Sequence, residues 1–212
     1  MREQEETDIF ETGVTLHEDE LSFVSSHTIC VCVVDIIDST RIILGLDSTQ
    51  KVRKYISTFI NSIAAIARKF GAKIMKTAGD SVIFYFPETS DSSNKEAIKK
   101  AFDCFAAMSA EHPLINDTLQ KEGLPPVSYR ISADYGRVEV GKSTTSKVDD
   151  LFGPTMIVCY KINTMARRNG IVIGEDLFRI ARSLRLDKSR KFVGKGSYPT
   201  GLKFPYPVYE VL

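Results

Sequence analysis

Two aspartates and a lysine occupy positions at which predicted strands end or turn. Asp35 closes the β-branched run at 28–34, and Asp80 lies at the bend of a predicted hairpin over 72–87, four residues after Lys76. If these segments are neighbours in one sheet, the two carboxylates come together, and adjacent carboxylates repel each other unless a cation lies between them. Hard divalent ions such as Mg²⁺ bind one or two carboxylates together with substrate phosphates. The pattern therefore predicts a metal-dependent phosphate chemistry.

Each of these features also has a simpler interpretation. The hairpin could be an ordinary surface turn with solvated Lys76 and Asp80, because Gly79 suits a tight bend whatever the function of its neighbours. Ser39 and Thr40, which follow Asp35, could serve only to cap the next helix. The choice depends on whether the rest of the chain brings other reactive groups to the same place.

The hydrophobic pattern predicts the elements that would position these residues. A strand over 28–35, a helix over about 47–70, the hairpin, a helix over 97–111 and a strand over 127–134 follow one another, with 113–126 as a connector. This is the order of a ferredoxin-like βαββαβ core, an α+β fold in which the first strand and the hairpin are neighbours. A C-terminal extension follows: a turn and strand at 136–141, a helix to about residue 168, a strand at 171–173, a helix at 175–183 and a hairpin within 191–212.

The composition is that of a globular protein without a nucleic-acid or membrane signature. The chain has 212 residues, of which 43% are hydrophobic and 26% charged, and its net charge is +1. Eight acidic residues lie within positions 1–20, which leaves a mildly basic remainder suited to an anionic small substrate. The longest apolar run, 29–34, is far shorter than the ~20 residues that span a bilayer. We expect a cytoplasmic protein without membrane insertion, and an acidic tail or arm over 1–27.

The cysteines and histidines do not indicate a zinc site. There are four cysteines and three histidines, no CxxC pair is present, and no histidine neighbours a cysteine. Cys30 and Cys32 lie inside the apolar strand, which is typical of buried thiols in a reducing compartment.

Over residues 28–212 the chain resembles the class III adenylate/guanylate (nucleotidyl) cyclase catalytic domain. Four segments carry the resemblance, in the order and with the spacing of the family. They are Val34-Asp35-Ile36-Ile37-Asp38-Ser39-Thr40, Lys76-Thr77-Ala78-Gly79-Asp80, Gly136-Arg137-Val138-Glu139-Val140-Gly141 and Asp150-Leu151-Phe152-Gly153. Diguanylate cyclases share a related core, but their Gly-Gly-Asp/Glu-Glu-Phe motif is absent from this sequence. The resemblance implies that 28–212 form one cyclase catalytic domain.

The resemblance implies a two-metal site. Asp35 and Asp80 would hold two Mg²⁺ or Mn²⁺ ions, with the carbonyl of Ile36 as a further ligand. The ions would bridge the triphosphate and activate the ribose 3′-hydroxyl for in-line attack on the α-phosphate. Backbone amides and hydroxyls around Ser39 and Thr40 would help to bind the phosphates.

The resemblance also implies ATP as the substrate. Lys76 and Asp150 occupy the family's purine-selecting positions, where a lysine donates to adenine N1 and an aspartate accepts from the exocyclic amine. Guanine presents the opposite pattern and is selected by glutamate and cysteine at these positions. Lys195, within the segment 194–196, resembles the family's C-terminal lysine that contacts phosphate.

In this family the site lies at a dimer interface, with metal carboxylates from one subunit and base-selecting and transition-state residues from the other. This chain carries both sets, so a homodimer would form two equivalent sites and a monomer would be inactive. A heterodimer with another cyclase chain is the alternative.

The chain departs from the family at the catalytic helix, which carries Asn-x-x-x-Arg. Counting from Gly153 without gaps places Ile157 and Lys161 at these two positions. Lys161 keeps the cation but lacks the planar fork of arginine, and Ile157 cannot form a hydrogen bond. A rival register, Asn163 with Arg167, spells the same motif but requires six extra residues before the pair. We favour Ile157 and Lys161.

The predicted function is therefore an adenylate cyclase, with turnover reduced by Ile157. The alternative is a catalytically weak or inactive cyclase-homology domain that binds ATP as a regulatory module. A third possibility, an interaction module that has lost its site, is disfavoured by the retained carboxylates Asp35 and Asp80.

Overall fold

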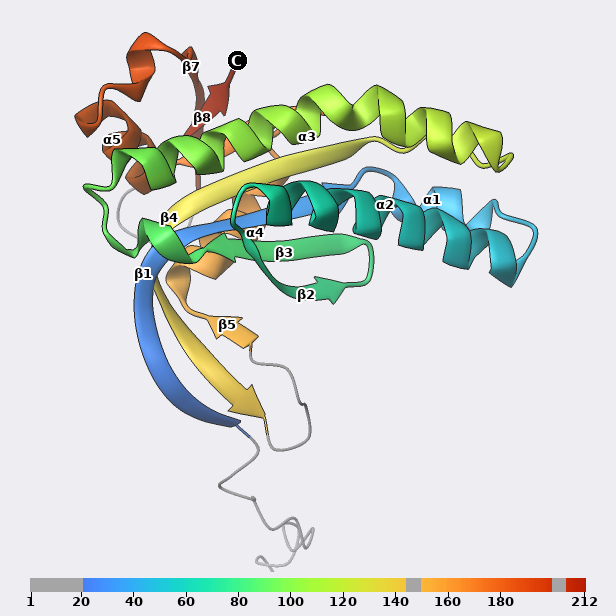
Figure 1. The fold of residues 1–212 in the computed structure, drawn as a ribbon, viewed down its shortest axis with the longest axis horizontal. Helices are drawn as coiled ribbons and strands as arrows, with labels where there is room; N and C mark the ends of the chain where they lie inside the picture. The colour runs from blue at the N-terminus through green and yellow to red at the C-terminus, as the bar shows by residue number, and fades with distance from the viewer. Residues whose placement is uncertain (1–20, 144–149, 200–204) are drawn as a thin grey trace, which may run out of the picture.

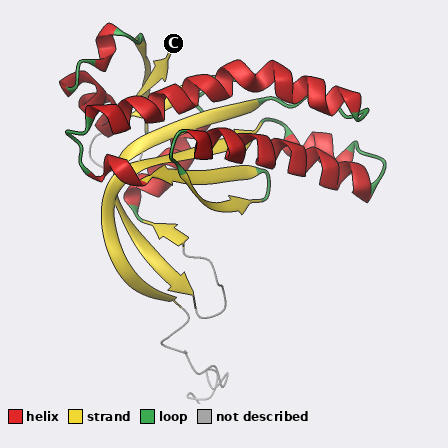
Figure 2. Ribbon diagram, in the orientation of Figure 1, coloured by secondary structure: helices red, strands yellow, loops and turns green. Residues whose placement is uncertain are grey.

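A computed structural model describes residues 21–143, 150–199 and 205–212. One mixed sheet runs through the molecule in the strand order β2-β3-β1-β4-β6-β8-β7, with the short β5 paired to β4 (Figure 1). The strands are β1 (Leu21–Ile36), β2 (Lys73–Ala78), β3 (Ser81–Phe86), β4 (Tyr129–Ser143), β5 (Asp150–Phe152), β6 (Ile171–Gly174), β7 (Phe192–Tyr198) and β8 (Tyr206–Val211). Helices cover the sheet (Figure 2). They are α1 (Ser39–Leu44), α2 (Thr49–Lys69), α3 (Lys95–Lys121), α4 (Pro154–Asn163) and α5 (Glu175–Ser183), with 3-10 turns at Pro87–Ser90 and Leu186–Lys188.

The predicted ferredoxin-like core and its C-terminal extension are confirmed. In the order β2-β3-β1-β4, β1 pairs antiparallel with both β3 and β4. Helices α2 and α3 lie side by side along one face of this sheet (Figure 1). β6, α5, β7 and β8 form the extension and lengthen the same sheet, because β6 pairs parallel with β4.

The continuous apolar run of β1 is explained by cover on both of its faces. Cys30, Cys32 and Val34 belong to the large core beneath α2 and α3. The alternate residues Val31 and Val33 pack in a second cluster that includes Met156 and Cys159 of α4. A strand buried on both sides has no solvent face, so its sequence does not alternate between apolar and polar residues. Packing on both faces therefore fixes the position of the carboxyl end of β1.

Three predicted boundaries are wrong. The connector predicted at 113–126 is largely helical, because α3 continues through Pro113 to Lys121 and buries Ile115 and Leu119. The turn predicted at 136–141 does not exist, because β4 pairs with β1 from Tyr129 to Ser143. Gly136 is needed there for close packing, since a Cβ atom would lie 2.6 Å from the Thr155 hydroxyl of α4. Finally, α4 ends at Asn163 rather than near residue 168.

The first strand begins earlier than its apolar run. β1 starts at Leu21, so residues 21–27 of the predicted arm are paired with the far half of β4. This two-stranded ribbon projects from the body in Figure 1. Residues 1–20, the acidic stretch, lie outside the described residues. Within the part of the chain that is described, no helix combines the length and the apolar character needed to cross a membrane.

Candidate active site

The two predicted metal carboxylates lie at the same end of the core sheet. Asp35 is the next-to-last residue of β1, and the pairing places it opposite Ser81 of β3. Asp80 directly precedes Ser81 in the two-residue turn between β2 and β3, where Gly79 adopts the positive φ of 62° that this turn requires. The Ser81 hydroxyl donates a short hydrogen bond to the Asp35 carboxylate. The sheet register therefore brings Asp35 and Asp80 together.

The electrostatics of Asp35 indicate a site prepared for a cation. Partial burial raises the pKa of its carboxyl, and the negative charge of Asp80 raises it further. The Ser81 hydrogen bond and the charge of Arg130 oppose this rise in the pKa. A half-buried carboxylate beside a second carboxylate is unfavourable without a counter-charge, and a divalent cation would remove both causes of the raised pKa.

The donor set fits magnesium or manganese with a phosphate-bearing substrate better than a closed protein site. Among the described residues, no group of three or more His, Cys, Asp or Glu side chains could hold a metal ion. Two carboxylates near a strand end leave most coordination positions open, which suits an ion that is also bound by substrate phosphates and water. Ile36, the predicted carbonyl ligand, is the last residue of β1 and is buried beside Asp35.

Arg130 is a charged neighbour of Asp35 that the sequence analysis did not identify. The pairing of β1 with β4 places it directly opposite Asp35, on the side away from Ser81. Its Nε is buried and has no hydrogen-bond partner within the described part of the chain. A guanidinium with an unused donor beside a carboxylate pair is suited to phosphate, which it can bind in a planar, bidentate way. No local signal distinguished Arg130, because β4 also carries other polar and charged residues, among them Ser132 and Asp134.

The predicted base-reading residues form an ion pair. Lys76 of β2 and Asp150 of β5 are joined by a short contact between the lysine Nζ and Oδ2 of the aspartate. The other carboxylate oxygen, Oδ1, accepts a hydrogen bond of 2.8 Å from the Leu151 backbone N–H. β5 is held against the projecting ribbon by an edge-to-face contact between Phe152 and Phe23, with ring centroids 5.6 Å apart. The lysine and the aspartate are therefore positioned together, as a donor beside an acceptor.

The orientation of α4 separates the two possible registers of its motif. The side chain of Asn163 is 4% exposed, and its Nδ2 donates to the Val33 carbonyl at 3.3 Å and to the Ser132 hydroxyl at 3.1 Å. It holds the helix onto the sheet and is unavailable to a ligand. Ile157, in contrast, is 56% exposed, and Lys161 is exposed one turn further along. The face of α4 that a substrate could reach therefore carries Ile157 and Lys161.

The remaining predicted phosphate contacts lie on separate elements. Ser39 and Thr40 are the first residues of α1, which follows the end of β1. The Lys195 ammonium, on β7, lies 3.5 Å from the Glu210 carboxylate. The Lys161 ammonium lies 5.8 Å from the ring centroid of Tyr198, also on β7. Lys161 is thus linked to β7, but the structure records no direct contact between these lysines and Asp35.

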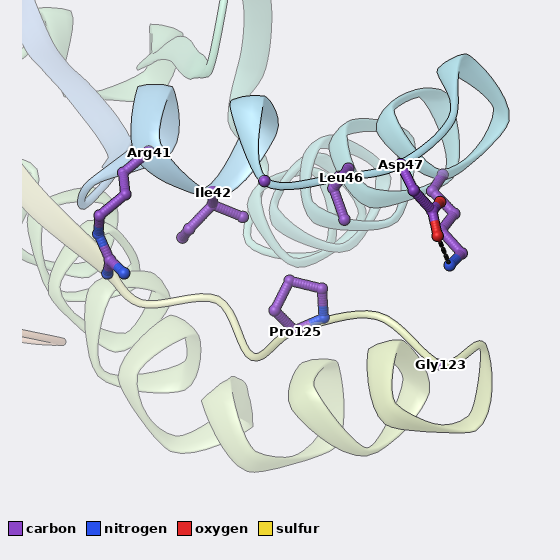
Figure 3. Close-up of a pocket in the computed structure, with 8 residues that line it drawn as sticks. Arg41, Ile42, Leu46, Asp47, Gly123 and Pro125 are labelled. Atoms are coloured by element: carbon purple, nitrogen blue, oxygen red, sulfur yellow. Dashed lines mark hydrogen bonds and ion pairs between the residues drawn. The ribbon is translucent and has the colours of Figure 1, made fainter.

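The pocket drawn in Figure 3 is separate from this constellation. It has a volume of about 390 Å³ and lies where the α1–α2 connection faces the segment after α3. None of the predicted site residues lines it. Its lining residues are Arg41, Ile42, Gly45, Leu46, Asp47, Lys51, Gly123 and Pro125.

Comparison with known proteins places this geometry in context. The family profile described as "Adenylate and Guanylate cyclase catalytic domain" matches residues 22–200. A curated relative, cytidylate cyclase from Staphylococcus aureus, is 26% identical over 199 residues. That similarity covers 87% of this chain and 47% of the relative, so the chain spans about half of the relative's length.

Solved structures share the fold at low sequence identity. The adenylyl cyclase CyaB from P. aeruginosa has a TM-score of 0.77 at 19% identity, covering 89% of this chain and 95% of that one. The guanylate cyclase domain of RhGC from Catenaria anguillulae, in complex with GTP, has a TM-score of 0.69 at 16% identity, covering 89% and 98% respectively. These likenesses establish a shared fold, and they include both adenylyl and guanylyl cyclases.

Proposed function

Because the chain belongs to the adenylate and guanylate cyclase catalytic domain family, we propose that it is an adenylate cyclase converting ATP to 3′,5′-cyclic AMP and pyrophosphate. The observation that carries the choice of base is the ion pair between Lys76 and Asp150. An ammonium can donate to adenine N1 while the neighbouring carboxylate accepts from the exocyclic amine. Guanine has an N–H donor at N1 and a carbonyl acceptor at the exocyclic position. The lysine donor would then face a donor and the aspartate acceptor would face an acceptor, which disfavours guanine.

The reaction assigns a role to each group at the end of the sheet. The ribose 3′-oxygen forms a bond to the α-phosphorus, the bond to the bridging oxygen breaks, pyrophosphate leaves, and the hydroxyl proton passes to water. When bound by Asp35, Asp80 and the Ile36 carbonyl, two Mg²⁺ or Mn²⁺ ions would neutralise the triphosphate and acidify the 3′-hydroxyl.

The cationic side chains and the start of α1 would complete phosphate binding. Arg130, Lys161 and Lys195 would offset the negative charge that develops on the transferring and leaving phosphates. Ser39 and Thr40 would contribute hydroxyl and backbone donors on the side of α1. Lys161 lacks the planar guanidinium of arginine, and the side chain of Ile157 has no polar atom. We therefore expect slower turnover than arginine and asparagine at these two positions would support.

We propose that the active form is a homodimer with two equivalent sites, each using the carboxylates of one subunit and the base-reading pair of the other. Support comes from the exposed apolar side chains that the monomer leaves uncovered, on the projecting ribbon and on α4. These are Leu21, Phe23, Val24 and Ile157. Exposed apolar side chains that lie close together are typical of an interface, as Leu21, Phe23 and Val24 do along the ribbon. A heterodimer with a second cyclase chain would use the same surface.

CTP is the second candidate substrate, because the curated relative is a cytidylate cyclase. Cytosine presents a ring-nitrogen acceptor beside an exocyclic amine, as adenine does, so Lys76 and Asp150 could read either base. Uracil and guanine both carry a ring N–H beside a carbonyl and are disfavoured by the same pair. The lysine and aspartate therefore favour the amino-bearing bases, and the size of the base must separate ATP from CTP.

The test is incubation of the purified chain with each of the four nucleoside triphosphates and Mn²⁺, followed by chromatographic identification of cyclic products. Asp80→Asn, prepared in the same way, is the inactive control. Cyclic AMP as the main product supports the proposal, and cyclic CMP supports the second candidate. Metal-dependent ATP binding without any product would favour the regulatory module, and absence of both binding and product would overturn all of these functions.

A further inference from the structure

The exposed face of α4 carries a tyrosine between the two residues already discussed. Thr155, Met156, Cys159, Ile162 and Asn163 are buried against the sheet. At about 100° per residue, Ile157, Tyr160 and Lys161 share the opposite, exposed face of the helix. Tyr160 follows Ile157 by one turn and directly precedes Lys161. The side chain of Tyr160 is 38% exposed, so its ring is largely covered while one part faces solvent.

The surroundings of Tyr160 include carboxylates that the proposed function uses. The negative charges of Asp150 and Asp35 both act on its phenol and, after burial, contribute to raising its pKa to about 12. Asp150, the larger of these two influences, belongs to the base-reading pair of the same subunit. In the split site proposed above, Tyr160 would therefore act together with Lys76 and Asp150 of its own subunit, opposite carboxylates supplied by the partner. The hydroxyl is therefore protonated at neutral pH and can act as a donor, but it is poorly suited to act as a base.

The Tyr160 hydroxyl has no recorded hydrogen bond to another of the described residues. Across 21–143, 150–199 and 205–212, the hydrogen bonds of the structure include none from Tyr160, although other buried or half-buried tyrosines, such as Tyr129 and Tyr206, do form them. Because the side chain is 38% exposed, its hydroxyl can donate to water in the free protein. A bound ligand with an acceptor oxygen could take the place of that water.

We infer that Tyr160 is a further substrate-contacting residue, whose hydroxyl donates a hydrogen bond to the ribose of the bound nucleotide and replaces the polar contact that Ile157 cannot make. This inference rests on the proposed cyclase function. Residues three apart on a helix have Cβ atoms about 5–6 Å from each other. The longer tyrosine side chain can therefore direct its hydroxyl toward the space beside Ile157. A ribose offers acceptor oxygens there, between a base near Asp150 and phosphates near the cations.

The test compares steady-state kinetics of the full chain with those of Tyr160→Phe, which keeps the ring and removes only the hydroxyl. We expect kcat to fall roughly 10- to 100-fold with little change in KM, because the contact fixes the ribose for the attack. The melting temperature should stay unchanged, since the hydroxyl has no partner among the described residues. Tyr55→Phe is the matched control, because the Tyr55 hydroxyl is also unpartnered but is buried in the core. This variant should keep wild-type kinetics.

Two further variants separate the hydroxyl from the ring and from the fold. Adding Ile157→Asn to Tyr160→Phe should restore most of the lost kcat, because it returns a donor to the same face of α4. If Tyr160→Phe keeps wild-type kcat while Tyr160→Leu loses it, the ring rather than the hydroxyl contacts the substrate and the inference is overturned. If the wild-type chain forms no cyclic nucleotide from any triphosphate, the proposed function fails, and the inference fails with it.

Discussion

Lys76 and Asp150, which are 74 residues apart in the chain, form an ion pair that joins the β2–β3 hairpin to β5. The same hairpin carries Asp80 at its turn, so one small element connects the base-reading pair to the carboxylate pair. In the proposed homodimer, each hairpin would therefore contribute Asp80 to one site and Lys76 to the other.

The first prediction concerns the choice of base. Replacing both partners, as Lys76→Glu with Asp150→Cys, reverses the donor and acceptor pattern and should shift the preferred substrate from ATP toward GTP. The measurement is kcat/KM for all four triphosphates. Lys76→Ala alone should lower activity with ATP without creating a new preference. An unchanged ranking of substrates in the double variant would contradict the proposed role of this pair.

The second prediction concerns Asp35, where stability and function oppose each other. Because burial and Asp80 raise the pKa of Asp35, its carboxylate destabilises the metal-free fold at neutral pH. Asp35→Asn should therefore raise the melting temperature measured without divalent ions, by roughly 2–4 °C for each kcal/mol relieved. The same change should remove Mn²⁺-dependent activity. Asp117→Asn, at an exposed position of α3, is the matched control and should change neither quantity.

The third prediction separates the two registers on α4. Asn163→Ala should lower the free energy of unfolding by about 1–3 kcal/mol, because it removes the buried amide that donates to the Val33 carbonyl and to the Ser132 hydroxyl. Ile157→Asn changes an exposed position and should alter stability by less than about 0.5 kcal/mol while raising kcat. Thermal unfolding and product formation on both variants provide the check. A rise in activity from substitution at 163, with none at 157, would favour the rival register.

The fourth prediction concerns pH-dependent stability and Asp134 of β4. This buried carboxyl accepts hydrogen bonds from the Tyr135 and Leu177 backbone N–H groups and from the Tyr206 hydroxyl, at 2.9, 3.3 and 2.9 Å. Burial nevertheless raises its pKa from 3.8 to about 7. The folded state therefore holds a proton that the unfolded chain releases, and stability from this group is complete below about pH 4 and lost by about pH 7.

Denaturant unfolding at several pH values measures this dependence. Asp134→Asn, which keeps the acceptor oxygen, should flatten the fall in stability between pH 4 and pH 7, a difference of up to about 4 kcal/mol at neutral pH. Asp117→Asn should leave the profile as it is. If wild-type stability rises through this pH window and the variant behaves in the same way, the assigned direction is wrong.

The fifth prediction tests the split site. Asp80→Asn and Asp150→Ala should each be inactive as homodimers, because every site lacks either a metal carboxylate or a base-reading residue. Mixing the two after partial dissociation should restore roughly a quarter of the wild-type rate, since half of the dimers are mixed and each holds one complete site. No recovery in a mixture that exchanges subunits would show that the two sets of residues act within one chain.

Much of the site could be predicted from local sequence. The apolar strand ending at Asp35 and the hairpin bend at Gly79 and Asp80 are short-range patterns with a direct physical cause, and both appear in the structure as predicted. The resemblance assigned Lys76 and Asp150 to the purine-selecting positions, and in the structure the two side chains form an ion pair. The roles of these residues in binding metal and nucleotide remain predictions.

The pairing of distant strands and the orientation of helices cannot be predicted from a local sequence pattern. Ser81 and Arg130 lie beside Asp35 because the strand register puts them there, and a shift of one residue would turn each to the other face of the sheet. The helix predicted over 97–111 continues as α3 through Pro113 to Lys121, because the apolar residues after Pro113 pack against the core.

The two candidate motifs on α4 illustrate the same distinction. The sequence allows the motif to be placed at Ile157 and Lys161 or at Asn163 and Arg167. Only the packing of α4 on the sheet buries Asn163 and exposes Ile157. Local patterns thus identify strands, turns and candidate residues, because backbone preferences act over a few positions. Which side chains face the same space depends on packing between elements distant in the chain, and that information resides in the fold.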